Sequence, residues 1–156
     1  MLDGDSTVFV SIRDAEEADA GVIAELISQL GYPTLEFEMI ERLARVRVDP
    51  QYRTLVAEVG TVVVGVAGVG LAPFYEHNGT YCRLLVLAVD DKHRRHGVGQ
   101  QLVQAAEDWA AGRGAAAMVV NSSHHRHDAH RFYERAGYKS TGVRFVKTLE
   151  SAGLRT

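Results

Sequence analysis

The chain has 156 residues, of which 46% are hydrophobic and 24% are charged, and this size fits a single hydrophobic core. The formal net charge of -3 gives no overall basic field, so nucleic acid is not an expected partner. No apolar run reaches the roughly 18 to 20 residues that span a bilayer, and no secretory leader is apparent, so we expect a cytoplasmic protein without a membrane partner. Cys82 is the single cysteine, which excludes an internal disulfide.

Two amphipathic helices are predicted in the first third of the chain. Apolar residues recur at helical spacing from Asp14 to Leu30, with Asp14 as the expected N-cap. Gly31 and Pro33 are residues that end a helix, so this one should stop there. A second helix is predicted from Glu36 to about Arg47, with its polar face exposed to solvent.

The β-rich segments that follow suggest an antiparallel meander. They span residues 53–58, 62–71 and 81–89. A helix over 100–111 then leads into a strand over 115–120, and a strand, turn, helix, strand unit normally places its two strands parallel. A fourth helix is predicted over about 126–136, and the alternation of residues 143–149 predicts a closing strand. The sequence therefore predicts an α/β domain on a mixed sheet.

The turn between the third strand and the next helix is the most informative stretch. Arg94 and Arg95 precede two closely spaced glycines, Gly97 and Gly99, where the helix begins. A helix N-terminus has unpaired backbone N–H groups and partial positive charge, so such a turn can hold a diphosphate. The Walker pattern is absent, and the dinucleotide fingerprint lacks its third glycine because Leu102 stands there.

This turn resembles the coenzyme A motif of the GNAT superfamily of N-acetyltransferases. The motif Gln/Arg-x-x-Gly-x-Gly/Ala is matched by Arg94, Gly97 and Gly99. Residues 129–138, Ala-His-Arg-Phe-Tyr-Glu-Arg-Ala-Gly-Tyr, resemble a second signature of the superfamily, Ala-x-x-Phe/Leu-Tyr-x-x-x-Gly-Phe/Tyr. Two signatures in the correct order, with a strand between them, are more specific than either alone. The C-terminal half is also similar to aminoalkylphosphonate and other small-amine N-acetyltransferases.

The resemblance implies a fold as well as an activity. It implies a single α/β (α+β) acetyltransferase domain over residues 1–156, with about four helices around a mixed, mostly antiparallel sheet of six or seven strands. The sheet would splay beside the strand ending at Val89, which frees backbone groups for the pantetheine arm of the cofactor. A homodimer is a further expectation from the family.

Acetyl-CoA is the cosubstrate that the resemblance implies, and a small-molecule amine would attack its thioester directly in a ternary complex. Tyr133 would be the general acid that protonates the departing thiolate. The residues expected to bind coenzyme A are Leu87, Ala88, Val89, Arg94, Arg95, His96, Gly97, Val98, Gly99, Gln100 and Arg126.

The general base stays open at this stage. Many relatives carry an acidic residue on the third strand, but Cys82 and Arg83 stand at its entrance here. The alternatives are Glu76, Asp90, Glu41 or an ordered water. We expect Cys82 to be a core residue rather than an acyl carrier.

A dense histidine cluster raises the question of a metal site. It consists of His124, His125, His127 and His130. Exposed histidines before a helix are the commoner explanation, and no cysteine assists, so no metal is expected.

The acceptor is also open. Aminophosphonates, aminoglycosides, polyamines and amino acids are all small amines that fit the pattern. Acetylation of a protein N-terminus or lysine is an alternative activity, and a non-catalytic acyl-CoA sensor is an alternative of a different class.

Overall fold

The computed structural model describes residues 9–122 and 127–149. Contacts along the chain divide it into two compact units, one up to Val120 and one from Asn121. The helices and strands of the first unit are β1 (Val10–Asp14), the 3-10 turn η1 (Glu17–Asp19), α1 (Ala20–Gln29), α2 (Glu36–Arg47), β2 (Tyr52–Val59), β3 (Val62–Pro73), β4 (Thr80–Val89), the 3-10 turn η2 (Asp91–His93), α3 (Val98–Gly112) and β5 (Met118–Val120). The second unit contains α4 (His127–Arg135). No helix within the described ranges is long and apolar enough to cross a bilayer.

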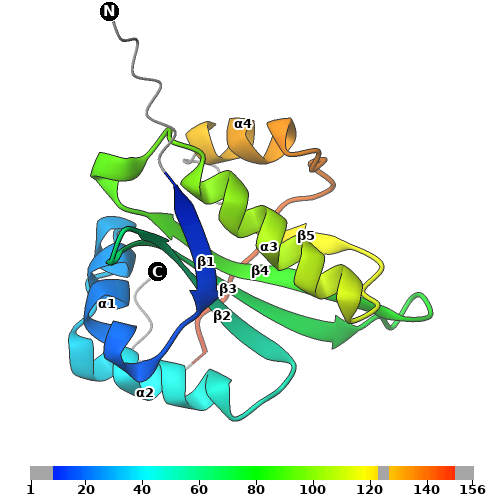
Figure 1. The fold of residues 1–156 in the computed structure, drawn as a ribbon. Coiled ribbons are helices and arrows are strands. Elements are labelled where there is room, and N and C mark those ends of the chain that lie inside the picture. Colours follow the sequence, from blue (N-terminus) through cyan, green and yellow to red (C-terminus); the bar gives the residue numbers. More distant parts are fainter. Residues whose placement is uncertain (1–8, 123–126, 150–156) are drawn as a thin grey trace, which may run out of the picture. The chain divides into compact units, whose positions relative to one another are not determined.

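The first unit is built on a mixed sheet with the strand order β1-β2-β3-β4-β5. The first four strands are antiparallel to their neighbours, and β5 runs parallel to β4. The predicted mixed, mostly antiparallel fold is therefore confirmed (Figure 1). The described residues form five strands rather than the six or seven expected.

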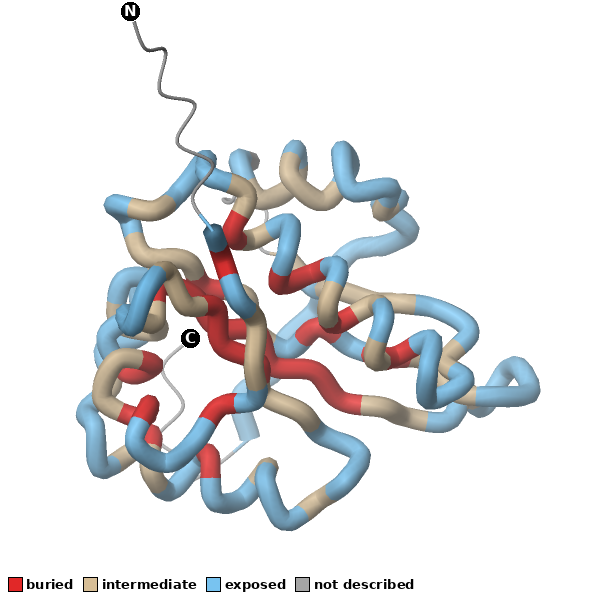
Figure 2. Tube along the Cα trace, viewed as in Figure 1, coloured by how far each residue is buried: buried red, intermediate tan, exposed pale blue. Residues whose placement is uncertain are grey.

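Helices pack on both faces of this sheet. Ile23 and Leu26 of α1 share a core with Met39 of α2 and with Val56 and Val66 of the sheet. Side chains alternate between the two faces of a strand, so Gly65 points to the opposite face, where it meets α3. Figure 2 shows the buried residues gathered in the central strands and along the inward sides of these helices.

Most predicted elements of the first unit are confirmed to within a few residues, but the expected start of the first helix is wrong. Asp14 is not its N-cap, because it ends β1, an edge strand that was not predicted. The helix begins after η1, and Gly31 ends it in the left-handed conformation, with φ of 103°.

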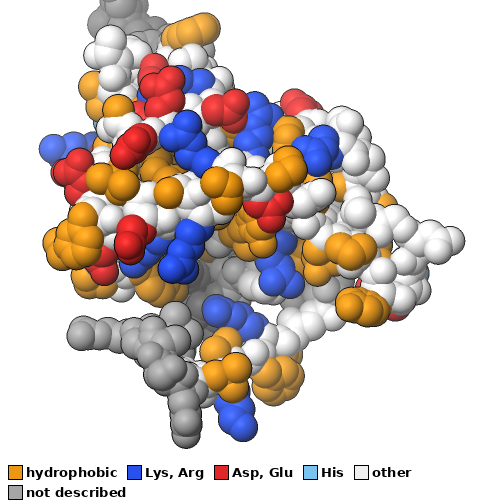
Figure 3. Space-filling view, turned by 90° about the horizontal axis from the view of Figure 1, so that it is seen from below, with side chains coloured by type: hydrophobic (Ala, Val, Ile, Leu, Met, Phe, Trp, Pro, Cys, Tyr) orange, Lys and Arg blue, Asp and Glu red, His pale blue; other side chains and the backbone are white. Residues whose placement is uncertain are grey.

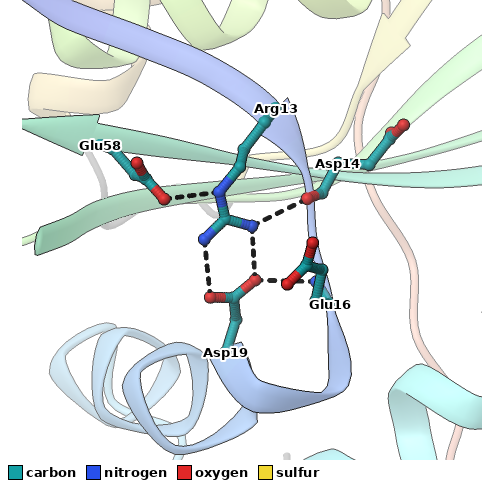
Figure 4. Close-up of polar contacts among 5 residues, drawn as sticks. All are labelled: Arg13, Asp14, Glu16, Asp19 and Glu58. Carbon is teal, nitrogen blue, oxygen red and sulfur yellow. Dashed lines mark hydrogen bonds and ion pairs between the residues drawn. The ribbon is translucent and has the colours of Figure 1, made fainter. Parts of the chain in front are cut away.

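A network centred on Arg13 ties β1 to the start of α1 (Figure 4). Its two terminal nitrogens contact the two carboxylate oxygens of Asp19 at 2.8 and 2.9 Å, and its Nε donates to Glu58 on β2. The same Asp19 carboxylate accepts the backbone N–H of Glu16 at 2.7 Å. These bonds, led by the one from Arg13, hold the pKa of Asp19 below its usual value. The network fixes where α1 leaves the sheet.

In the second unit, α4 covers most of the helix predicted over 126–136, and Gly137 follows it with φ of 95°. The closing strand predicted over 143–149 is wrong, because no strand forms there. Alternation of apolar and polar residues suits a strand, but a strand also needs a neighbour for its backbone hydrogen bonds, and none of the described strands pairs with this segment.

Candidate active site

The turn between β4 and α3 has an unusual backbone. Gly97 precedes the first residue of α3 with φ of 80°, a left-handed conformation that glycine adopts without a steric penalty. Arg95 has φ of 67° and is the one non-glycine residue with positive φ in the described part of the chain. An arginine held in this region costs free energy, so the surrounding structure must impose the conformation. The strain marks this turn as a candidate site.

Backbone donors are left open along the same turn. The first helical hydrogen bond of α3 runs from the N–H of Gln101 to the carbonyl of Gly97. The N–H groups of residues 95–100 have no acceptor among the residues that the structure describes. Because α3 is 15 residues long, its N-terminus adds partial positive charge to these donors. The arrangement suits an anion with several oxygen atoms.

The base of the turn is fixed by Asp90. Its carboxylate accepts from Nε2 of Gln29 at 2.9 Å and from the backbone N–H of Lys92, and it lies 3.0 Å from Nδ1 of His93. Gln29 Oε1 also accepts the backbone N–H of Asp91 at 3.1 Å. The bond from Gln29, followed by that to His93, lowers the pKa of Asp90. This carboxylate therefore holds the turn on the end of α1 and is poorly suited to remove a proton.

Close packing sets the position of α3 on the sheet. A Cβ on Gly65 would lie 2.9 Å from Cδ1 of Leu102 and 3.1 Å from Cγ1 of Val98. A side chain at this position would crowd Leu102 and Val98, where α3 packs on β3. The open N–H groups depend on this contact for their place beside the end of β4.

The last half of β4 has one free side. Its register with β3 shifts at Leu85, which is the extra residue of a bulge between Leu84 and Val86. β5 pairs only with residues 82–84, so residues 85–89 lack a strand partner on that side within the described chain. This agrees with the splay that the family resemblance implies. Leu87, Ala88 and Val89 thus lie on the strand that runs directly into the open turn.

The side chains of the predicted cofactor-binding turn differ in exposure and in their contacts. Arg94 turns back, with its terminal nitrogen 2.9 Å from Asp91 and its Nε 3.3 Å from the carbonyl oxygen of Val89. Arg95, His96 and Gln100 are exposed, whereas Val98 is buried. Val98 can therefore serve a ligand only through its backbone. The structure brings residues 94–100 and 87–89 together at the two ends of one turn.

Two of the predicted site residues belong to the second unit of the chain. Arg126 lies outside the described residues. Tyr133 belongs to α4 of the second unit, where its ring makes edge contacts with Phe132 and Tyr138 at centroid distances of 5.2 and 5.7 Å. The catalytic role of Tyr133 stays a prediction.

Cys82 and the histidine cluster are the other reactive candidates. Cys82 is fully buried, and burial raises the pKa of its thiol, so it behaves as a core residue. His124 and His125 lie outside the described residues, so the question of metal binding by the histidine cluster stays open. Elsewhere in the described chain, no group of three or more His, Cys, Asp or Glu residues could hold a metal ion.

A pocket of about 240 Å³ opens beside the bulge of β4, enclosed by α1, α2 and the strands β2 to β4. Arg42 and Arg53 are the charged residues in its lining. None of the three carboxylates considered as general base lines it. All of its lining residues fall within the first 86 residues of the chain.

Sequence reasoning missed Gln29 and this arginine pair. No local signal marks Gln29, because it is an ordinary polar residue in the last turn of a helix and its partners are about 60 positions away. Arg42 and Arg53 come from different elements and line one pocket only after folding. The heptad-like spacing of Met39, Arg42, Leu43 and Val46 could have placed Arg42 on the inward face of α2.

Comparison with known proteins gives matches over most of the chain. The model of the acetyltransferase (GNAT) family matches residues 19–138. An aminoalkylphosphonate N-acetyltransferase of Salmonella typhimurium is 30% identical over 139 residues, which cover 88% of this chain and 90% of that relative.

Similar solved structures include acetyltransferases. A GNAT family acetyltransferase of Staphylococcus aureus is 26% identical with a TM-score of 0.77, over 90% of this chain and 98% of that one. An aminoglycoside N-acetyltransferase solved in complex with CoA shares the fold with a TM-score of 0.80 at 16% identity, over 92% of this chain and 96% of that one.

Proposed function

Because the chain belongs to the GNAT family of acetyltransferases, we propose that it transfers an acetyl group from acetyl-CoA to the primary amine of a small molecule. The observation that carries the proposal is the strained turn at residues 95–97, with open backbone donors at the start of α3. The name of the Salmonella relative supports a small amine as the acceptor. The aminoglycoside enzyme was solved in complex with CoA, which supports acetyl-CoA as the donor.

The residues of the turn fit the cofactor that the family uses. In this proposal, the N–H groups of residues 95–100 bind the pyrophosphate, because they are unpaired donors at a positive helix end. Arg95, which is exposed, adds charge beside them. The free side of Leu87, Ala88 and Val89 holds the pantetheine arm through backbone hydrogen bonds. When bound, acetyl-CoA supplies the activated acetyl group.

Proton transfer is the chemical task left to the protein. The amine must lose a proton as it attacks, and the thiolate must gain one as it leaves. We propose Tyr133 as the acid, on the strength of the signature in which it stands. Asp90 is poorly suited to act as the base, since its hydrogen bonds stabilise the charged form and lower its pKa.

Calorimetry with acetyl-CoA, followed by thiol release with a panel of amines, tests the proposal. We expect binding, and turnover on at least one small amine. Tyr133→Phe should lower turnover by roughly 10² to 10⁴-fold while changing acetyl-CoA affinity little, because it removes one proton donor. Phe132→Leu on the same helix is the control for packing.

Each result separates the proposal from its alternatives. Binding without turnover on small amines or peptides would favour an acyl-CoA sensor, and turnover restricted to peptides would favour a protein acetyltransferase. Failure to bind acetyl-CoA would overturn the assignment of the turn itself. The cytoplasmic location and the homodimer stay predictions.

A further inference from the structure

The pocket beside β4 is small and mostly apolar. Its lining includes Ile23 and Ile27 of α1, Met39 of α2, and Gly68 and Val86 of the sheet. Its volume of about 240 Å³ is below the usual range for drug-sized ligands, so it suits a molecule of a few heavy atoms. Its lining reaches Leu85 and Val86, directly before the segment proposed to hold the pantetheine arm. The pocket therefore adjoins the place where an acetyl group would be presented.

The charges that line this pocket all have one sign. They belong to Arg42 and Arg53, two of the lining residues, and no Asp or Glu is among those residues. A cationic acceptor such as a polyamine would bring two or more ammonium groups toward these two arginines, of which only Arg53 has a carboxylate partner, Asp14, within the described residues. An anionic group would instead be attracted and could accept several hydrogen bonds.

Both arginines have donors left for a ligand. Arg42 is exposed, and its Nη1 donates to the hydroxyl of Thr34 at 3.2 Å. It has no carboxylate partner within the described residues. Arg53 uses its Nε for Asp14 at 2.6 Å, and its two terminal nitrogens have no acceptor within the same residues. Arg42 is accordingly the stronger candidate, and Arg53 a second donor whose charge Asp14 partly offsets.

The charge of the wider surface does not produce this selectivity. Figure 3 shows one face of the molecule, where Lys and Arg side chains alternate with Asp and Glu side chains and with hydrophobic ones. The net charge of -3 would weakly repel an anion at long range. Selection for an anion must therefore come from the local lining of the pocket.

We propose that the acceptor is a short aliphatic amine carrying an anionic group, a carboxylate or a phosphonate, which Arg42 and Arg53 bind while the amine lies near Leu85 and Val86. This inference rests on the proposed acetyl transfer and names the substrate class of the same site.

The sheet register gives the span that such an acceptor must bridge. Thr54 of β2, Gly68 of β3 and Val86 of β4 lie in one row across the sheet. Two strand spacings separate the ends of this row, or about 10 Å. A guanidinium side chain that reaches in from α2 or β2 covers part of this distance. An amine separated from its anionic group by a few carbon atoms spans the remainder.

The experiment compares four amines of similar length: 2-aminoethylphosphonate, β-alanine, propylamine and putrescine. Thiol release gives kcat/KM for the wild type and for Arg42→Gln, Arg53→Gln and Arg45→Gln. Arg45 is an exposed arginine of the same helix that does not line the pocket, so its variant is the matched control.

We expect the preferred anionic amine to exceed propylamine by about tenfold or more, and putrescine to be the poorest acceptor. Arg42→Gln should lower kcat/KM for the anionic amine by about tenfold, through KM, and leave propylamine within about twofold. Arg53→Gln should have a smaller effect in the same direction, and Arg45→Gln none. The ratio between 2-aminoethylphosphonate and β-alanine identifies the preferred anionic group.

The failure of this inference is distinguishable from failure of the proposed function. Turnover of propylamine or putrescine equal to that of the anionic amines, or a preference unchanged in Arg42→Gln, would overturn the inference and leave acetyl transfer standing. If acetyl-CoA binds but no amine is acetylated, the proposed function fails. Calorimetry of 2-aminoethylphosphonate and β-alanine with the CoA-saturated protein then decides: binding weakened by Arg42→Gln supports the anionic pocket, and no binding overturns it.

Discussion

The network around Arg13 and the turn before α3 use hydrogen-bond donors in opposite ways. At Arg13, all three guanidinium nitrogens contact acceptors of the protein, on Asp19, Glu58 and the carbonyl of Asp14. At residues 95–100, six consecutive backbone N–H groups face no acceptor within the described chain. The hydrogen-bond donors of the Arg13 network are satisfied within the protein, whereas those of the turn are available to a ligand.

This difference separates stability from binding. Satisfied donors contribute to the free energy of folding, and removing a partner leaves a charge without compensation. Open donors at a helix end contribute little to the free energy of folding, and they form hydrogen bonds when an anion binds. Mutations at the Arg13 network should therefore lower stability, and mutations at the turn should lower ligand affinity.

The largest effect is expected from a negative charge in the turn. Asp tolerates positive φ better than most residues, and a Cβ at Gly97 would have no heavy atom within 4 Å outside its chain neighbours, so Gly97→Asp should fold. Its carboxylate would repel the pyrophosphate, and acetyl-CoA affinity measured by calorimetry should fall by about 100-fold. Gly97→Asn is the neutral control of equal size and should lose much less. Equal losses in the two variants would contradict an anion site here.

The matching change in the Arg13 network should act on stability. Asp19→Ala removes the partner of both terminal nitrogens of Arg13, and we expect the free energy of unfolding to fall by about 2 to 3 kcal/mol. Urea denaturation measures this. Acetyl-CoA affinity at a temperature where the variant is folded should stay within about twofold of the wild type. A large loss of affinity would show that the two regions are coupled.

Sequence reasoning reached the turn because its signals are local. Gly97 and Gly99 after an apolar strand mark a helix start with open donors, and the structure places the left-handed residue at Gly97. The helix predicted from Glu36 to about Arg47 is confirmed over Glu36–Arg47, since its amphipathic period is contained in the segment.

The errors share a non-local cause. β1 was not predicted, and its last residue was taken as the cap of the following helix, because a five-residue edge strand is recognised through its pairing with β2 and not from the periodicity of its own residues. Residues 143–149 alternate like a strand but form none. Gln29 and the Arg42 and Arg53 pair become visible only after the chain has folded. Candidate ligand sites with consecutive residues are thus readable from sequence, and assembled ones are not.

A smaller effect is expected from the link between α1 and the turn. Gln29→Ala removes the hydrogen bonds to the Asp90 carboxylate and to the N–H of Asp91. We expect a loss of about 1 kcal/mol in stability and a fall of a few-fold in acetyl-CoA affinity, because the turn keeps its sequence but loses its support. Gln104→Ala, which removes an exposed bond to Asp108 within α3, is the control. An affinity unchanged in Gln29→Ala would mean that the turn holds its shape without α1.

The smallest effect, and the one that separates the two regions by charge alone, is the response to acid. Hydrogen bonds from Arg13 lower the pKa of Asp19, so its stabilising contribution is fully present above its usual pKa of about 3.8 and is lost as the pH falls through the lower value. Hydrogen bonds from Gln29 and His93 also lower the pKa of Asp90, but this residue lies at the exposed turn.

Urea denaturation between pH 6 and pH 3 should therefore show a clear decline in stability for the wild type, and a flatter one for Asp19→Asn. Each proton taken up on unfolding, but not by the folded protein, corresponds to about 1.4 kcal/mol per pH unit, which is an upper limit for a single carboxylate. Asp90→Asn should change the slope less, because solvent screens its partners. If Asp90→Asn flattened the curve as much as Asp19→Asn, the turn would contribute to folding as strongly as the Arg13 network, and the division between a stabilising region and a binding region would not hold.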